Sequence, residues 1–355
     1  MKTLQQPIGI IKAEGVGPEI IDCALSCLHE IEKLKDIKFN FIEYKGPAPA
    51  TEFNESAYSK IKKFYSAIKS KNGCILRAAI YARIVYKLRQ DFNLICKPIY
   101  FEPIPELFDD SLLKKEIVQN LNVLLIRENA QGLLFSKEKV EKRKNQRIMY
   151  GTFTYEENKI KSLVEYAFEQ ASKRNNVLHL FIKGDLWRKL TPLWLEAVES
   201  TNKKYPKIKF DWDHADTGFA DLLHHPKKYD VVVALGIAGD IIADPLATLL
   251  YGSHAIVPSA NIDPKGFMVF QTVHGTAYAI AGQNKANPIG AIRAAAMMLR
   301  LFFKMEKEAY IIENSVRKVL AQGHRTIDMY RPDLGHKLAG TNEMGELIAN
   351  EISKN

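Results

Sequence analysis

The chain begins with a short apolar run at residues 8–12, followed by a glycine-containing turn and an amphipathic segment. In that segment Pro18 suits the first turn of a helix. Apolar residues then recur at helical spacing, at Ile20, Ile21, Ala24, Leu25, Leu28 and Ile31. The sequence therefore predicts a strand, a glycine turn and a helix over residues 8–34.

The same alternation continues along the chain. Strands are predicted at residues 72–78, 122–126, 177–183 and 229–236, and helices at residues 160–174, 190–200 and 289 to about 307. Strands that alternate with helices predict an α/β fold with a largely parallel sheet. No internal repeat or long linker is evident, so we expect a second domain to form where the chain leaves the first and returns to it.

Composition supports a globular protein of this kind. The 355 residues are 46% hydrophobic and 26% charged, which is enough for two domains around a substantial core. The start of the chain lacks the apolar core of a signal peptide, and Arg293 and Arg300 interrupt the most apolar later segment. The four cysteines form no CxxC pair, which is typical of buried thiols. We expect a cytoplasmic protein with no membrane partner.

The formal net charge of +9 favours anionic partners, which include nucleic acid, a phosphorylated cofactor and a polycarboxylate. Much of the excess lies at residues 137–147, "KEKVEKRKNQR". Because no aromatic residues are interleaved there, we interpret this stretch as a solvated loop and expect no nucleic-acid partner.

Two carboxylates are spaced for a metal site. Asp240 and Asp244 stand four residues apart after the apolar strand at residues 229–236, so both project from one face if a helix begins there. Hard oxygen donors suit Mg²⁺ or Mn²⁺, although aspartates are also favoured at helix N-termini for electrostatic reasons alone. Asp216 is a third candidate, in "HAD".

Lys183 and His274 are candidates for other roles. Lys183 ends an apolar strand, and burial near a metal can lower the pKa of such a lysine until it acts as a general base. A surface lysine is the alternative. His274 precedes a glycine turn that could approach a cofactor closely, or it is an ordinary loop residue.

In this order the motifs resemble the isocitrate and isopropylmalate dehydrogenases, the β-decarboxylating dehydrogenases. The resemblance rests on "EGVGPEI", "LRQ", "IRENAQG", "IKGDLW", "HAD", "YDVVVALGIAGDIIAD", "VPSANI" and "VHGTAYAIAGQNKANPIGAIRAAAMMLR", and with the tail it covers residues 8–348. It implies an isopropylmalate-dehydrogenase-like fold with a large cofactor-binding α/β domain from residues 1–92 and 242–355. A smaller inserted domain, residues 93–241, would provide dimerisation and part of the substrate site.

The resemblance also implies roles for single residues. Asp240 and Asp244 would bind Mg²⁺ or Mn²⁺ together with Asp216 of the second subunit of a homodimer. Lys183 matches the catalytic lysine, and it would act with Asp216 across that shared site. The adenosine half of the cofactor would be lined by His274, Gly275, Thr276, Ala277 and Asn287.

The departures from the family pattern concern the substrate. Arg89 and Arg127 match two of three substrate-binding arginines, and the third becomes Lys97, which keeps the charge but loses the planar fork. Arg83 and Val85 stand where isocitrate dehydrogenases carry serine and asparagine. Leu134 stands where the family carries the tyrosine that protonates the product after CO₂ leaves, and leucine donates no proton.

Two interpretations of function follow. One is a metal-dependent NAD(P) oxidoreductase for a 2-hydroxy polycarboxylic acid, with oxidation and possible decarboxylation. The other is a noncatalytic or regulatory homologue that binds ligand without turnover. Ala279 and Ile280 stand where family members carry the residues that distinguish NAD from NADP, and they match neither set. Arg331 matches one arginine that binds the phosphate of NADP in NADP-using members. We expect NAD, with NADP not excluded.

Overall fold

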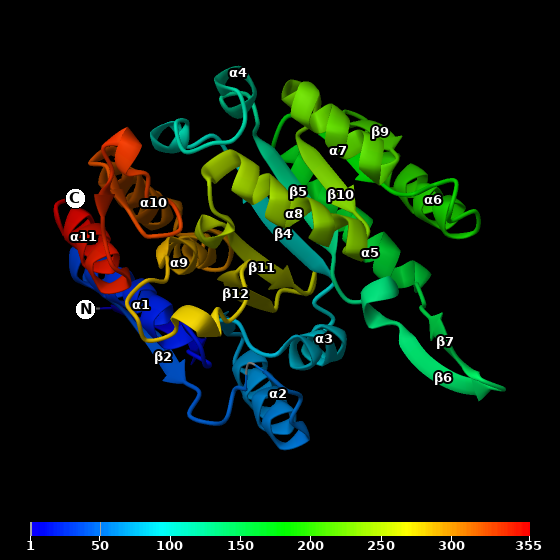
Figure 1. Ribbon diagram of the computed structural model, residues 1–355, viewed down its shortest axis with the longest axis horizontal. Coiled ribbons are helices and arrows are strands. Elements are labelled where there is room, and N and C mark those ends of the chain that lie inside the picture. The colour runs from blue at the N-terminus through cyan, green and yellow to red at the C-terminus, as the bar shows by residue number, and fades with distance from the viewer. Residues whose placement is uncertain (1, 50) are drawn as a thin grey trace.

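The computed structural model describes residues 2–49 and 51–355, and within them a ten-stranded sheet runs through the molecule (Figure 1). Its strands lie in the order β2-β1-β3-β12-β11-β4-β5-β10-β8-β9. Their bounds are β1 Lys2–Ile11, β2 Ile37–Glu43, β3 Cys74–Arg77, β4 Cys96–Phe101, β5 Val123–Glu128, β8 Val177–Phe181, β9 Lys209–Asp213, β10 Val231–Ala234, β11 Pro258–Ile262 and β12 Met268–Thr272.

The sheet is parallel toward both edges and antiparallel at its centre. β11 is antiparallel to β12 and to β4, and β4 is antiparallel to β5, while the other neighbouring pairs are parallel. The predicted α/β fold with a largely parallel sheet is therefore confirmed. The reversal falls where strands from the two ends of the chain meet strands from its middle.

Eleven α-helices belong to the described residues. They are α1 Gly17–Lys35, α2 Glu55–Ser70, α3 Ala82–Asp91, α4 Lys115–Val118, α5 Glu157–Ser172, α6 Leu190–Asn202, α7 Ala215–His224, α8 Gly236–Tyr251, α9 Ile289–Leu301, α10 Glu306–Ala321 and α11 Thr341–Ser353. In the predicted first helix, α1, Pro18 stands in the first turn and Ile20, Ile21, Ala24, Leu28 and Ile31 are buried. The helix ends at Lys35, and the following cap residue, Asp36, has a left-handed backbone with φ 51°.

Two apolar cores lie on opposite faces of the first half of the sheet. Along β1, Ile8 and Ile10 pack in the core that includes α1 and α9, whereas Ile11 packs in the second core with α2 and α3. Successive strand residues point to opposite faces, so this division places α2 and α3 together on one side. The same alternation puts Leu76 of β3 in the first core and Ile75 in the second.

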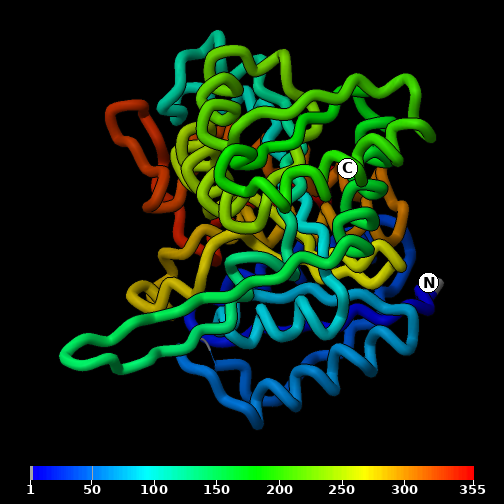
Figure 2. Tube along the Cα trace, turned by 90° about the vertical axis from the view of Figure 1, so that its right-hand side faces the viewer, coloured from blue at the N-terminus to red at the C-terminus, as the bar shows by residue number. Residues whose placement is uncertain are grey.

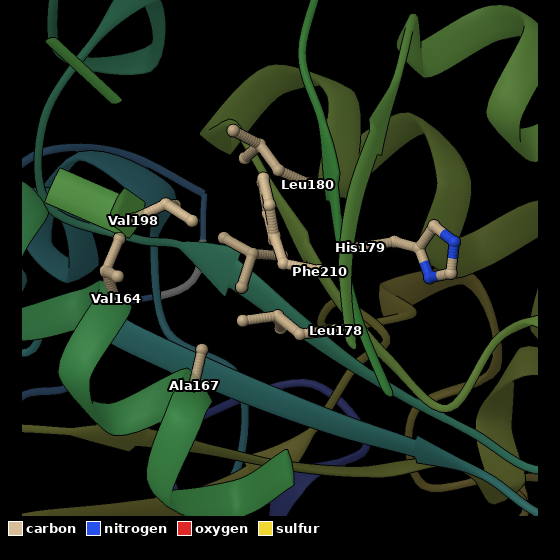
Figure 3. A pocket seen from close by; sticks show the side chains of 8 residues that line it. Val164, Ala167, Leu178, His179, Leu180, Val198 and Phe210 are labelled. Carbon is tan, nitrogen blue, oxygen red and sulfur yellow. The ribbon is translucent and has the colours of Figure 1, made fainter. Parts of the chain in front are cut away.

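In the second half of the sheet, α5 and α6 cover one face of β8. Figure 3 shows Leu178 and Leu180 pointing toward Val164 and Val198 of these helices, while the ring of His179 points to the other side. The cavity among these apolar side chains measures about 10 Å³. A void of that size and lining is a packing gap rather than a ligand site.

Two expectations for local structure were wrong. Residues 137–147 form most of a β-hairpin, β6 Lys137–Arg143 and β7 Gln146–Thr152, which projects from the body of the molecule (Figure 2). The long helix predicted to reach residue 307 ends at Leu301, and α10 begins at Glu306. Between them Lys304 adopts a left-handed backbone, which ends helical hydrogen bonding.

The four cysteines are free and buried, as predicted. Within the described part of the chain, every helix is too short or too polar to span a membrane.

Candidate active site

A cavity of about 150 Å³ lies over the centre of the sheet, beneath α3. Its walls come from β3, β12, β4, β5, α3 and α8, so they combine both halves of the sheet. Three predicted substrate-binding residues line it, Arg89, Lys97 and Arg127, together with the predicted metal ligand Asp240. The fold therefore brings together residues that lie up to 151 positions apart in the chain.

The cations of the cavity are held close by strand pairing. Lys97 of β4 stands directly opposite Arg127 of β5 in the antiparallel register, and Arg89 of α3 covers them. All three side chains are buried. Burial, reinforced by the charge of Arg127, lowers the pKa of Arg89 to about 9 and the pKa of Lys97 well below its usual range. An anion entering the cavity would relieve this mutual repulsion.

Of the two predicted metal ligands on α8, Asp240 lines the cavity and Asp244 lies outside its lining, so we refer to α8 as the rim of the cavity. Asp240 accepts a hydrogen bond from Nη1 of the buried Arg127, which fixes one carboxylate at the mouth of the cavity. Asp244 follows one helical turn later, as predicted. Partial desolvation raises the pKa of Asp244, and the charge of Lys97 opposes that rise. The pair offers two hard oxygen donors beside the cation cluster, which is a donor set that suits Mg²⁺ or Mn²⁺.

Lys183 and Asp216 form a separate pair. Nζ of Lys183 donates to both carboxylate oxygens of Asp216, at 3.0 and 2.8 Å, and both side chains are substantially exposed. The hydrogen bond raises the pKa of Lys183 and lowers that of Asp216. Within one chain the lysine thus lacks the burial that would lower its pKa. Among the described residues, no three His, Cys, Asp or Glu side chains lie close enough to hold a metal ion, so Asp216 does not join Asp240 and Asp244.

The glycine turn after β12 borders the same cavity. His274 and Gly275 line it, and Nε2 of His274 is buried without a hydrogen-bond partner. Burial lowers the pKa of His274. The next residue, Thr276, accepts a hydrogen bond at 3.0 Å from the backbone N–H of Val16, in the turn before α1. That turn needs glycine, because Gly15 has φ +67° and a Cβ there would lie 2.1 Å from the Thr276 carbonyl oxygen.

The remaining predicted cofactor residues are distributed differently. Ala277 is exposed with a left-handed backbone, φ 42°, so the chain turns sharply after Thr276. Asn287 is buried, donates to Asp328 at 3.1 Å and caps the start of α9 through the N–H of Ile289. Arg331 is paired with Asp333 at 2.8 Å. Its guanidinium is therefore already engaged by a carboxylate.

Leu134 lies in a short 3-10 turn, residues 133–135, between β5 and the hairpin. Its side chain packs near Gly236 at the start of α8, where the carboxylate of Glu128 also lies. Oε1 of Glu128 accepts the N–H groups of Ala130 and Gln131, whereas Oε2 is buried without a partner. Burial raises the pKa of Glu128 to about 7.

Sequence reasoning missed two charged residues of this region, Arg77 and Glu128. Arg77 lines the cavity, and it ends the apolar run "CILR", where a cation after a buried strand was the available signal. Glu128 directly follows the predicted Arg127, and the sequence offers no signal that gives it a role of its own.

The sequence profile described as isocitrate/isopropylmalate dehydrogenase matches residues 7–348. This chain belongs to that family. The 3-isopropylmalate dehydrogenase of Carboxydothermus hydrogenoformans is 32% identical over 97% of this chain and 94% of its own length. That of Neisseria meningitidis serogroup A is 33% identical over 96% and 98%.

A solved structure is similar over the same extent. The isocitrate dehydrogenase from Methylococcus capsulatus has a TM-score of 0.80 with 24% identity, and the match covers 98% of this chain and 99% of that one. At this identity the likeness shows the fold. The family resemblance and the fold expected from the motifs are both confirmed.

This chain carries a buried carboxyl, that of Glu128, whose ionisation opposes folding. Between pH 4.5 and about 7 the Glu128 carboxyl ionises in the unfolded chain but stays protonated in the folded one, so the free energy of unfolding falls as pH rises. The loss is complete above pH 7 and amounts to at most about 3 kcal/mol. Glu128→Gln keeps the oxygen that accepts the two N–H groups, so this pH-dependent component should disappear.

Denaturant unfolding at pH 5 and pH 8 measures the effect. Glu138→Gln, at an exposed position on β6, is the control and should retain the wild-type difference. An undiminished difference in Glu128→Gln would contradict the assignment.

Proposed function

We propose that the protein is a metal-dependent NAD(P) oxidoreductase that oxidises a 2-hydroxy polycarboxylic acid of the isocitrate or isopropylmalate type. The observation that carries this proposal is the cavity in which the buried Arg89, Lys97 and Arg127 lie beside Asp240. A cluster of buried cations is unfavourable without anions to pair with it. Family membership supports the same class of reaction.

In this proposal the three cations bind and orient the carboxylates of the acid. Arg89 and Arg127 offer planar forks that match a carboxylate bidentately, while Lys97 offers a point charge. The buried Nε atoms of both arginines lack hydrogen-bond partners, so donors remain for a ligand. Binding the acid would exclude water from the cavity and hold the hydroxyl-bearing carbon near the rim formed by α8.

The metal would be held by Asp240 and Asp244 together with the partner subunit's Asp216. The spacing of the first two and their oxygen donors fit Mg²⁺ or Mn²⁺. When bound, such a cation lowers the pKa of the substrate hydroxyl and stabilises negative charge on its oxygen. Lys183 is paired with Asp216 within one chain. The partner subunit's Lys183 would therefore lie on the same side of the site as the partner's Asp216, where it would accept or direct the hydroxyl proton.

A homodimer with shared sites is therefore part of the proposal. Large apolar side chains are exposed beside both halves of the site: Ile241, between the α8 aspartates, is 65% exposed, and Leu186, after Lys183, is 67% exposed. The projecting hairpin also exposes Val140 and Met149. Exposed apolar surface of this kind supports a protein interface.

We propose NAD as the hydride acceptor, bound along the turn that contains His274, Gly275, Thr276 and Ala277. A Cβ at the exposed Gly275 would meet nothing within 4 Å, so the backbone is open to close approach, and the unpartnered Nε2 of His274 offers a polar contact. Asn287 would support this turn from the start of α9. Arg331 would be the contact for a 2′-phosphate, and its pairing with Asp333 favours NAD over NADP.

The proposed division into a domain of residues 1–92 and 242–355 and a domain of residues 93–241 is supported by strand order. The first segments supply β2, β1, β3, β12 and β11, and the inserted segment supplies β4, β5, β10, β8 and β9. The substrate cavity would then lie between the domains.

Purified protein assayed with Mn²⁺ and each nicotinamide cofactor tests the activity directly. The substrate panel is isocitrate, homoisocitrate, isopropylmalate, malate and tartrate. We expect reduction of NAD with at least one of these acids and loss of activity on removal of the metal with a chelator. Clear binding of an acid or nucleotide without any reduction would favour the regulatory interpretation instead.

Mixed dimers test the shared site. Lys183→Ala and Asp240→Ala proteins should each be inactive, but a mixed dimer rebuilds one intact site. Random pairing makes half of the dimers mixed, each with one working site of two, so activity should return to about a quarter of wild type.

The matched control mixes Lys183→Ala with Asp216→Ala. Because these two residues come from the same chain, no mixed dimer regains an intact site and no activity should return. Recovery in the control, or none in the test mixture, would be evidence against a shared site.

Leu134→Tyr tests the missing proton donor. We propose that protonation of the enol after CO₂ leaves is limited at this position, since general acid catalysis contributes about 10²- to 10⁴-fold. The variant should raise the amount of protonated keto product formed per CO₂ released, measured on the best substrate of the panel. Leu133→Tyr, at the exposed neighbouring position, is the control. An unchanged ratio in Leu134→Tyr would show that another group supplies the proton.

A further inference from the structure

Arg77 adds a fourth cation to the substrate cavity, from β3. It ends β3 and lies on the same face as Ile75, which packs with α2 and α3. It lines the cavity with Gln271 of the neighbouring strand β12, whereas Lys97, Arg127 and Asp240 form the far wall. None of the motifs that mark the family includes this residue.

The Arg77 guanidinium is buried with its charge unbalanced. The side chain is 3% exposed, Nη1 donates at 2.9 Å to the neighbouring carbonyl oxygen of Ala78, and Nε has no partner. Its charge opposes the burial that raises the pKa of Tyr65, so the phenol lies close, but a neutral phenol does not balance a cation. Burying an unpaired charge is costly unless a ligand pairs with it.

The charges around the cavity do not balance. Its lining contains four cationic side chains, and Asp240 is the one carboxylate among the lining residues. The two carboxylates of a hydroxy diacid would match the cations on β4, β5 and α3, which leaves Arg77 without an anion. A hydrocarbon substituent on the acid would then lie against an unpaired guanidinium.

We infer that Arg77 binds a third carboxylate, so that the substrate is a tricarboxylic hydroxy acid rather than a diacid with a hydrocarbon substituent. This inference rests on the proposed function. The apolar Ile80 and Val85 also line the cavity, and they would contact the carbon atoms that separate the carboxylates. An arginine fork at this position selects for a planar anion by bidentate hydrogen bonding.

Equilibrium binding in the presence of Mn²⁺ tests the inference without requiring turnover. The tricarboxylic probes are isocitrate and homoisocitrate, and the dicarboxylic probes are isopropylmalate and malate. Wild-type protein should bind the better tricarboxylic acid at least tenfold more tightly than isopropylmalate. The reverse order overturns the inference and needs no variant protein.

Arg77→Gln then assigns the preference to this residue. Loss of a charged hydrogen-bonding partner should weaken tricarboxylate binding by about 10- to 100-fold, while malate binding changes less than threefold. Arg77→Lys keeps the charge but loses the planar guanidinium. Its affinity for the tricarboxylic acid should therefore lie between those of wild type and Arg77→Gln. Equal weakening of both classes of acid, or unchanged tricarboxylate binding, overturns the inference.

Two controls separate the remaining explanations. Arg293→Gln removes another buried arginine, which pairs with Glu102 away from this cavity, and it should lower thermal stability without altering the ratio of tricarboxylate to dicarboxylate binding. NAD binding without any acid should be unchanged in Arg77→Gln. Weaker NAD binding by Arg77→Gln would mean that Arg77 contacts the cofactor. That result would overturn the inference but would be compatible with the proposed function. Wild-type protein that binds none of the acids overturns both.

Discussion

The buried positive charge at the centre of the sheet is the constraint on which the rest of the site depends. Arg127 meets Asp240, but Arg77, Arg89 and Lys97 share the same small cavity without carboxylates of their own. Their mutual repulsion and desolvation are visible in the lowered pKa values of Arg89 and Lys97. Such an arrangement costs folding free energy, and a bound polyanion would recover that cost as binding free energy.

The reversal of the sheet makes this concentration of charge possible. Because β4 and β5 pair in antiparallel register, Lys97 and Arg127 stand opposite each other and share a face. β3 and β12 lie on the other side of β11 and border the same cavity, which is why Arg77 lines it together with Lys97 and Arg127.

The sequence was sufficient for the parts of this structure that depend on local pattern. Apolar runs gave β8 and β10, helical periodicity gave α1, and the four-residue spacing put Asp240 and Asp244 one turn apart on α8. The prediction of a loop at residues 137–147 was wrong because a solvated hairpin carries charge on both faces and has no apolar alternation to detect. The prediction that the helix continues beyond Leu301 was wrong because apolar residues continue up to Lys304, where the backbone becomes left-handed.

The charged residues that were missed depended on long-range contacts. In the sequence Arg77 is an ordinary cation at the end of a strand. It lines the cavity only because β3 pairs with β12 and α3 lies above them. The raised pKa of Glu128 likewise comes from burial against α8, more than 100 residues away in the chain. Pattern in one segment carries no information about either environment.

The separation of Lys183 and Asp216 from the α8 aspartates also has a mechanistic consequence. An exposed lysine whose carboxylate partner raises its pKa is a poor proton acceptor near neutral pH. If a second subunit brought that pair to the rim formed by α8, a divalent cation would compete with Lys183 for the Asp216 carboxylate, and the interface would desolvate the lysine. Both effects lower the lysine pKa. Assembly would thus couple metal binding to activation of the base, so that neither half of the site could act before the other is in place.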